Sequence, residues 1–254
     1  MPKKLTVITI NYNNYSGLIR TAESVINQTS RSDIEWIIVD GDSSDSSKDW
    51  IKKNKSNVDV LISEPDNGIY DAMNKGMEIA SGEYLWFMNS GDAIFDLNTA
   101  HLLLQDLESG KDIYFSDTMF IDQKGVEIGL ISQLKPQRLP KRLVPNSFRF
   151  GMNVCHQSFV VKKKEASKYN TEYRLASDID WVITILKNSP SSICCNYILS
   201  RFETGGSSYQ NTNEAWKERY KVLREHYGRW PNILAHGYIL LRRILFKIRM
   251  SLKM

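Results

Sequence analysis

Cysteine is scarce in this chain, with three residues among 254, at Cys155, Cys194 and Cys195. They form neither a CxxC pair nor the regular framework of a disulfide-rich secreted domain, so we expect reduced thiols and a cytoplasmic protein. The chain also lacks an uninterrupted run of about 18 apolar residues, the length of a membrane-spanning helix. Its first apolar stretch is broken at Asn11, too early for a signal peptide.

A strong excess of one charge sign is also missing. Lys and Arg number 33 against 29 Asp and Glu, a formal net charge of +4. This balance is too mild to predict nucleic-acid binding, which uses basic patches with interleaved aromatic residues. The excess lies at the end of the chain, where six basic residues and no acidic residue follow position 228: Arg229, Arg242, Arg243, Lys247, Arg249 and Lys253.

Two glycine-rich motifs are absent as well. Neither Gly-x-Gly-x-x-Gly nor Gly-x4-Gly-Lys-[Ser/Thr] follows a predicted strand. Their absence argues against a dinucleotide cofactor and against a P-loop nucleotidase. No internal repeat or low-complexity tract occurs, and the apolar content of 42% suffices for one compact domain with an appendage.

Apolar β-branched runs alternate with helical patterns through the first hundred residues. Strands are predicted at 5–10, 35–40, 58–62 and 84–88, and a helix at 69–80 with Asp66 or Asn67 as its cap. Repeated β-α units predict the α/β class, with a mainly parallel sheet flanked by helices. The second half predicts a strand at 112–115, a hairpin at 118–131, strands at 153–161 and 193–202, and helices at 178–186 and 211–227.

Polar residues follow each of the four early strands. They are Asn11-Tyr12, Asp40-Gly41-Asp42, Glu64-Pro65-Asp66 and Asn89-Ser90-Gly91-Asp92. In open parallel sheets ligands bind beyond the carboxyl ends of the strands. Gathered carboxylates repel one another unless a cation lies among them, and Mg²⁺ or Mn²⁺ with a nucleotide diphosphate would satisfy these groups.

Four ordered motifs in the first hundred residues resemble the inverting glycosyltransferases of family 2, which have a GT-A fold. The motifs are VITINYN at 7–13, IIVDGDSSD at 37–45, EPDNGIYDAMNKG at 64–76 and ASGEYLWFMNSGD at 80–92. The resemblance implies transfer of a hexose or N-acetylhexosamine from a UDP-sugar to a saccharide acceptor, expected to be linked to a lipid diphosphate. Bacterial surface-polysaccharide synthesis (O-antigen, capsule or exopolysaccharide) is the implied setting.

The resemblance also implies roles for residues of this chain. Thr9, Asn11, Tyr12 and Asp40 would hold the uracil and ribose, whereas Asp66, Asn67, Gly68, Asp71 and Lys75 would lie near the nucleotide and donor sugar. The family's Asp-x-Asp metal motif reads Ser90-Gly91-Asp92 here. Asp92 would bind Mn²⁺ or Mg²⁺ directly, Ser90 would bind water or the sugar, and diphosphate oxygens would complete the coordination.

The family's catalytic base comes from an acidic pair at the start of a helix in the second half. The matching stretch is RLASDIDW at 174–181, where Ser177 replaces the first acid. Asp178 is the preferred base, with Asp180 as the alternative. His156 lies on a predicted strand that can reach the acceptor cleft, but no second histidine at ligand spacing supports a metal site there.

Structural interpretations remain open at each of these positions. Asn11 and Asp40 are alternatively loop caps, and Asp71 and Lys75 are alternatively a solvated i,i+4 pair. Asp92 is alternatively the cap of a helix at Leu97, and Asp178 and Asp180 are alternatively acids that favour a helix N-terminus. His156 is alternatively a hydrogen-bonded strand histidine. Two functional alternatives also remain. One is a haloacid dehalogenase-type phosphatase with Asp40 as nucleophile, and the other is a nucleotide-sugar-binding protein without catalysis.

The predicted organisation has three parts. Residues 1–110 would bind the nucleotide sugar, residues 111–210 would bind the acceptor within the same catalytic domain, and residues 211–254 would form a helical extension. Residues 233–252 place apolar and basic side chains on one amphipathic helix, suited to an anionic leaflet. We expect peripheral attachment to the inner face of the plasma membrane; packing of this helix on the domain is the alternative.

Overall fold

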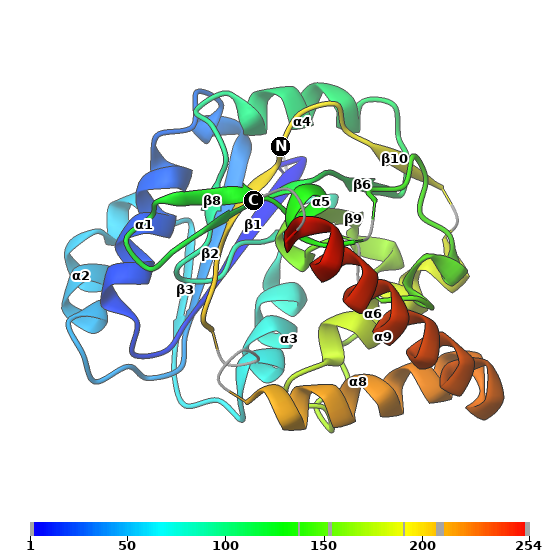
Figure 1. Cartoon of the computed structure of the whole chain (residues 1–254). Coiled ribbons are helices and arrows are strands. Elements are labelled where there is room, and N and C mark those ends of the chain that lie inside the picture. Colours follow the sequence, from blue (N-terminus) through cyan, green and yellow to red (C-terminus); the bar gives the residue numbers. More distant parts are fainter. Residues whose placement is uncertain (1–2, 137, 152–153, 190, 207–210, 252–254) are drawn as a thin grey trace.

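A mostly parallel seven-stranded sheet runs through the middle of the molecule (Figure 1). The computed structural model describes residues 3–136, 138–151, 154–189, 191–206 and 211–251. The strand order is β10-β6-β9-β4-β1-β2-β3, and β9 runs antiparallel to both of its neighbours. The bounds are β1 (Leu5–Asn11), β2 (Ile34–Asp40), β3 (Val60–Ser63), β4 (Tyr84–Phe87), β6 (Ile113–Phe115), β9 (Phe159–Lys162) and β10 (Ser192–Cys194).

The register of this sheet brings the polar strand ends together. Asn11, the last residue of β1, is paired with Asp40, the last residue of β2. Asp40 is in turn paired with Ser63, the last residue of β3. Parallel strands that end in register present their following loops at one edge, so the predicted gathering of polar residues is confirmed for these three strands.

Helices cover both faces of the sheet because its strands are apolar on both sides. On one face α1, α2 and α4 pack over the core around Trp36 and Trp86. On the other face α3, α6 and α8 pack over the core around Phe87 and Trp181. The helices are α1 (Tyr15–Ile26), α2 (Ser47–Lys53), α3 (Ile69–Ile79), α4 (Thr99–Leu107), α5 (Ile131–Leu134), α6 (Ser177–Asn188), α8 (Thr212–Tyr227) and α9 (Arg229–Ser251), with 3₁₀ turns η1 (Arg31–Asp33), η2 (Lys55–Asn57), η3 (Pro145–Phe148), η4 (His156–Ser158) and η5 (Lys163–Glu165).

A second sheet of four strands follows the Ser90-Gly91-Asp92 turn. Its order is β5-β11-β7-β8, with bounds β5 (Ala93–Ile94), β7 (Thr118–Ile121), β8 (Glu127–Leu130) and β11 (Ser200–Glu203). The hairpin predicted at 118–131 is confirmed as β7 and β8. The single strand predicted at 193–202 is wrong, because the chain leaves the large sheet after β10 and enters the small sheet as β11.

Two further local predictions need correction. The strand predicted at 153–161 is confirmed only from Phe159, since residues 156–158 form η4 and residue 153 lies outside the described residues. The predicted cap of α3 is wrong as well. Gly68 is the N-cap, with φ of 110°, and the Asp66 carboxylate accepts a hydrogen bond from its N–H at 2.8 Å. A glycine fits there because L side chains rarely adopt positive φ.

The last two helices form a pair joined at Gly228. α8 packs against α6, and α9 turns back from the outer end of α8 toward the middle of the molecule (Figure 1). Arg242 on α9 donates from Nη2 to the carbonyl of Phe150 at 2.7 Å. Within the described ranges, no helix has the length and apolarity needed to cross a membrane.

Candidate active site

Asp40 ties the first three strand ends together. Its fully buried carboxylate accepts hydrogen bonds from Asn11 Nδ2 at 2.7 Å and from Ser43 N and Oγ at 2.9 and 2.6 Å. The Oδ1 atom of Asn11 is buried without a hydrogen-bond partner among the residues that the structure describes. Unpaired buried polar atoms are costly, so this oxygen marks a point where a ligand donor would be favoured.

Thr9 lies elsewhere, inside the protein core. It is fully buried, and its hydroxyl accepts a hydrogen bond from Nε1 of Trp36 at 3.0 Å. The Thr9 hydroxyl therefore makes a hydrogen bond inside the core, and the structure does not bring it to the edge with Asn11 and Tyr12.

Tyr12, Gly41 and Asp66 form an open platform at the same edge. Tyr12 is 65% exposed. A Cβ atom on Gly41 would lie 2.5 Å from Oδ2 of Asp66 and 3.1 Å from Cδ2 of Tyr12. The missing side chain at position 41 therefore lets an aromatic ring and a carboxylate meet. Gly41 is not among the site residues predicted from the sequence, although its place directly after β2 is a usable signal.

Asn67, Asp71 and Lys75 brace the loop before α3. Oδ2 of Asp71 accepts a hydrogen bond from the Asn67 N–H at 3.0 Å. Lys75 Nζ lies 2.8 Å from the Glu64 carboxylate and 3.9 Å from Asp71, and it donates to the Pro65 carbonyl at 2.9 Å. The hydrogen bond to Glu64 raises the pKa of the Lys75 ammonium. These contacts shape the loop that carries Asp66.

The Ser90-Gly91-Asp92 turn is held by α1. Gly91 has φ of 109°, a conformation that favours glycine. The Thr21 hydroxyl accepts from the Gly91 N–H at 3.1 Å and donates to the Asp92 carbonyl at 2.6 Å. Asp92 caps no helix, because α4 begins at Thr99 after its N-cap Asn98. The capping interpretation of Asp92 is therefore wrong.

The Asp92 carboxylate is buried against the second sheet. It is 5% exposed, and its Oδ1 accepts a hydrogen bond from the Glu203 N–H at 2.9 Å. Burial raises the pKa of Asp92 to about 8. Arg20 forms an ion pair with Glu203 and donates to the Gly91 carbonyl at 3.2 Å. Arg20 and Glu203 were missed from the sequence because only the tertiary fold brings them to this turn.

The atoms beside Asp92 suit a hard divalent cation. Ser90 Oγ and Asn89 Oδ1 are buried without hydrogen-bond partners in the described part of the chain, as is Asn11 Oδ1. Carboxylate, amide and hydroxyl oxygens are the ligands that Mg²⁺ and Mn²⁺ prefer. No cluster of three or more His, Cys, Asp and Glu side chains suited to a metal occurs among the described residues. The oxygen set therefore fits a cation that also binds a phosphate-bearing substrate.

Asp178 and Asp180 face different partners at the start of α6. Asp178 Oδ1 accepts a hydrogen bond from the Tyr70 hydroxyl at 3.3 Å. Burial raises the pKa of Asp178, and the charge of Arg219 opposes this rise. Asp180 Oδ1 lies 2.6 Å from Nε2 of His226 on α8. Asp180 thus joins two helices, whereas no cation among the described residues lies within salt-bridge distance of Asp178.

His156 is enclosed by aromatic rings. Phe87, Tyr169 and Trp181 surround its imidazole, and Nε2 lies 2.5 Å from the Tyr169 hydroxyl. Burial lowers the pKa of His156 to about 3, so the ring is neutral near pH 7. This environment favours the structural interpretation of His156, now on η4 instead of a strand.

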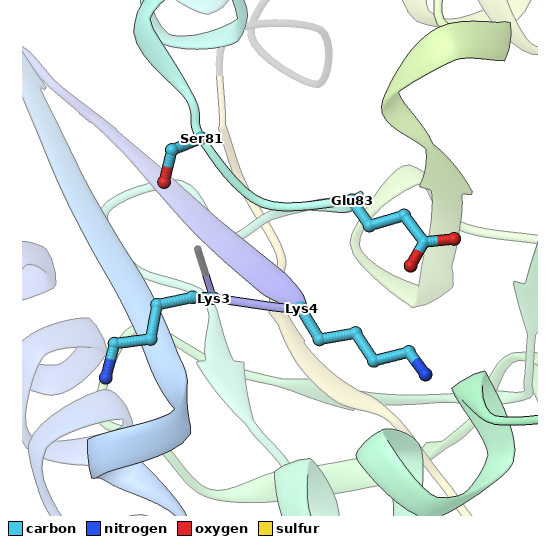
Figure 2. Close-up of a pocket in the computed structure, with 4 residues that line it drawn as sticks. All are labelled: Lys3, Lys4, Ser81 and Glu83. Atoms are coloured by element: carbon cyan, nitrogen blue, oxygen red, sulfur yellow. The ribbon is translucent and has the colours of Figure 1, made fainter. Parts of the chain in front are cut away.

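A surface hollow lies at the opposite end of β1, lined by Lys3, Lys4, Ser81 and Glu83 (Figure 2). Both lysines already have partners, because Lys3 donates to the Ser32 carbonyl and Lys4 pairs with Glu108 at 2.5 Å. Because it lies at the amino end of β1, the hollow is separate from the polar edge at the carboxyl ends of the strands.

Comparison with known proteins identifies the family of this chain. The sequence model of Glycosyl transferase family 2 matches residues 6–169, which include β1 to β4 and their polar ends. The chain belongs to glycosyltransferase family 2. An uncharacterised glycosyltransferase of Mycobacterium tuberculosis is 28% identical to this enzyme over 244 residues, which cover 92% of this chain and 89% of that protein. The predicted family and enzyme class are confirmed.

Two further comparisons cover most of this family 2 glycosyltransferase. Poly(ribitol-phosphate) beta-N-acetylglucosaminyltransferase TarP of Staphylococcus aureus is 28% identical over 240 residues, 86% of this chain and 73% of that protein. The S. aureus TarS 1–349 structure in complex with UDP has a TM-score of 0.65 at 14% identity, covering 88% of this chain and 65% of that chain.

A third solved structure shares the fold. The mannosyltransferase PcManGT from Pyrobaculum calidifontis, in complex with GDP-Man and Mn²⁺, has a TM-score of 0.62 at 15% identity. The alignment covers 94% of this chain and 72% of the PcManGT chain. The mainly parallel sheet flanked by helices matches these structures, which confirms the predicted GT-A-like fold class.

Proposed function

We propose that this enzyme transfers a hexose or N-acetylhexosamine from a UDP-sugar, with inversion, to a saccharide acceptor linked to a lipid diphosphate. The observation that carries the proposal is the approach of Asp92 and Asp178 to one buried group. Burial raises the pKa of the Cys155 thiol to about 11, and the charges of both carboxylates add to the rise. This shared neighbour supports a single site bordered by the turn after β4 and the start of α6.

The donor would bind across the edge formed by β1, β2 and β3. Tyr12 offers an exposed ring for the base, and Asn11 Oδ1 is open to a donor group. TarS has been solved with UDP and with UDP-GlcNAc, which supports a UDP-sugar here. In this scheme residues 1–110 bind the donor, residues 111–210 bind the acceptor and residues 211–254 form the extension.

Asp92 would hold Mn²⁺ or Mg²⁺ together with the diphosphate of the donor. The cation, when bound, neutralises negative charge on the departing diphosphate. The chain contributes one buried carboxylate and the unpaired oxygens of Ser90 and Asn89. The Mn²⁺ in the PcManGT complex supports a divalent cation in this fold.

Asp178 would accept the proton of the acceptor hydroxyl as that hydroxyl attacks the anomeric carbon. A base is most effective when its pKa approaches the working pH, and burial raises the pKa of Asp178 in that direction. The Tyr70 hydroxyl donates to Asp178 and orients the carboxylate. Asp180 is less suited, because His226 already occupies its Oδ1.

The phosphatase alternative fails on the geometry of Asp40. A nucleophile must reach its substrate, whereas the Asp40 carboxylate is fully buried and accepts hydrogen bonds from Asn11 and Ser43. The setting in bacterial surface-polysaccharide synthesis remains part of the proposal, supported by the action of TarP on poly(ribitol-phosphate) that its name states.

The decisive experiment compares Asp178→Asn with Asp180→Asn. Labelled UDP-sugars are supplied with Mn²⁺ and a synthetic lipid-diphosphate monosaccharide, and transfer and UDP affinity are both measured. Asp178→Asn should lower kcat by about 100-fold or more, as expected for loss of a general base, with UDP affinity unchanged. Asp180→Asn should stay within a few-fold of wild type. Loss of UDP binding in Asp178→Asn would remove this residue from the base role.

A wild-type enzyme that releases sugar from none of the nucleotide sugars would overturn the transferase proposal. That outcome would favour a nucleotide-sugar-binding protein without catalysis.

The α9 helix would place the enzyme on the inner face of the plasma membrane. Its exposed apolar side chains include Trp230, Leu234, Leu240, Leu241 and Leu245, each more than half exposed. No acidic residue occurs from Arg229 to the end of the chain. An apolar surface on a positively charged helix suits an anionic leaflet, which would bring the site close to a lipid-linked acceptor.

A further inference from the structure

Three cationic side chains from distant parts of the chain form a cluster around one of them, Arg219, and Arg219 interacts electrostatically with Asp178. Lys135 directly follows α5, Arg219 lies on α8 and Arg243 lies on α9. The guanidinium carbons of Arg219 and Arg243 lie 5.4 and 4.6 Å from the centroid of the same indole ring, that of Trp216. One aromatic ring therefore holds two cations from two helices in a single cluster.

This cluster has unused hydrogen-bonding capacity. Nε of Arg219 is buried and has no hydrogen-bond partner within the described residues. Among those residues, no carboxylate lies within salt-bridge distance of Lys135, Arg219 or Arg243. A buried donor on a charged group is costly when it stays unpaired, so the arrangement favours an anion that the chain does not supply.

The charges in the cluster repel one another. Burial lowers the pKa of the Lys135 ammonium, and the charges of Arg219 and Arg243 lower it further. Burial also lowers the pKa of Arg219, while Asp178 opposes that shift. Asp178 thus offsets the charge of Arg219 only, and the cluster keeps an excess of positive charge. An anion with two negative charges would balance this excess.

We propose that Lys135, Arg219 and Arg243 form a phosphate-binding site next to the catalytic base. Guanidinium groups match phosphate oxygens with paired N–H donors, and a lysine adds a compact charge. The three residues lie outside β1 to β4 and α3, which carry the donor residues. The inference rests on the proposed function, because Asp178 marks where the acceptor hydroxyl would lie.

The phosphate can come from two sources, the acceptor or the diphosphate of the donor. The position beside Asp178 favours the acceptor. An acceptor phosphate held here would orient its sugar hydroxyl toward the base. A donor diphosphate held here would share its charge between these cations and the metal at Asp92.

The test measures direct binding, which does not depend on sugar transfer. Inorganic pyrophosphate, UDP and N-acetylglucosamine 1-phosphate are titrated calorimetrically into the full chain with a chelator present. The variants are Arg219→Gln, Arg243→Gln and Lys135→Gln, and Arg224→Gln is the control, since Arg224 is exposed on the same helix as Arg219. Circular dichroism confirms that each variant is folded, and Arg243→Lys tests whether charge alone suffices.

The cluster variants should weaken pyrophosphate binding roughly tenfold each, and Arg224→Gln should leave it unchanged. Equal weakening for UDP identifies the donor diphosphate as the ligand, whereas weakening for the sugar phosphate with unchanged UDP affinity identifies the acceptor. Either pattern supports the site. Wild-type protein that binds none of the three at millimolar concentration, or equal affinity in all variants, overturns it. Loss of transfer in Asp178→Asn with unaltered phosphate binding in the cluster variants would reject this site and leave the proposed function standing.

Discussion

The main-chain N–H of Glu203 donates to Oδ1 of Asp92 at 2.9 Å, although 111 residues separate them in the sequence. This hydrogen bond joins β11 of the small sheet to the turn after β4. The Glu203 side chain pairs with Arg20 on α1, and Arg20 also donates to the Gly91 carbonyl. Two distant segments, α1 and β11, thus hold the turn that carries the one carboxylate proposed to bind the metal.

Asp92→Asn should separate folding from metal binding. The asparagine carbonyl still accepts from the Glu203 N–H, so we expect a folded protein. Its loss of charge should weaken Mn²⁺ binding and reduce transfer by about 100-fold or more, because electrostatic stabilisation of the leaving group is lost. Electron paramagnetic resonance of added Mn²⁺ in the presence of UDP measures the affinity. Asp96→Asn, in the following loop, is the control; activity near wild type in Asp92→Asn would contradict the proposed metal role.

Asp180→Ala should affect stability more than catalysis. Asp180 lies 2.6 Å from His226 Nε2 and connects α6 to α8, and both side chains are largely buried. Losing this hydrogen bond should lower the free energy of unfolding by about 1–2 kcal/mol. Urea denaturation measures the loss, and Asp180→Asn, which keeps an acceptor oxygen, should recover part of it. A large fall in kcat for a folded Asp180→Asn variant would instead point to a catalytic role.

His156→Phe should change how stability depends on pH. The pKa of His156 is about 3 in the folded protein against an ordinary value of 6.5, so below pH 6.5 protons bind preferentially to the unfolded state. Stability of the wild type therefore falls as the pH drops from 6.5 toward 3. Between pH 7 and pH 4.5 this residue should account for about 2.5 kcal/mol.

The His156→Phe variant should not lose stability in this way as the pH falls, because phenylalanine binds no proton. At pH 7 it should be less stable than wild type by about 1 kcal/mol, because the Tyr169 hydroxyl loses its partner. At pH 4.5 the order should reverse. Urea unfolding at both pH values measures the effect, and pH profiles that stay parallel would show that His156 is not the group responsible.

Replacement of Leu234 and Leu241 by serine should weaken membrane binding. These side chains are 73% and 54% exposed on α9. Burial of a leucine contributes about 1.5–3 kcal/mol, so losing both should reduce partition onto phosphatidylglycerol vesicles by at least about 100-fold. Co-sedimentation measures the partition. Leu97→Ser, at an exposed leucine before α4, should have no effect; equal binding by the α9 variant would contradict the proposed attachment.

The first half of the chain was predictable because its signals are local. Each of the first four strands is a short apolar run that ends in a polar turn, and such runs predict strands whatever the rest of the chain does. The second half was less predictable. One apolar stretch at 193–202 serves two sheets, and His156 sits in a 3₁₀ turn whose aromatic neighbours come from β4 and α6 and from Tyr169.

Sequence alone determined the α/β class, the family and the edge of the sheet at which Asn11, Asp40 and Asp92 lie. Tertiary structure decided what surrounds these residues. It buried Thr9, paired Asp180 with His226, brought Glu203 to Asp92 and gathered Lys135 and Arg243 around Arg219, which interacts with Asp178. Strand and turn signals depend on neighbouring residues, whereas burial and charge pairing depend on which distant segments pack together.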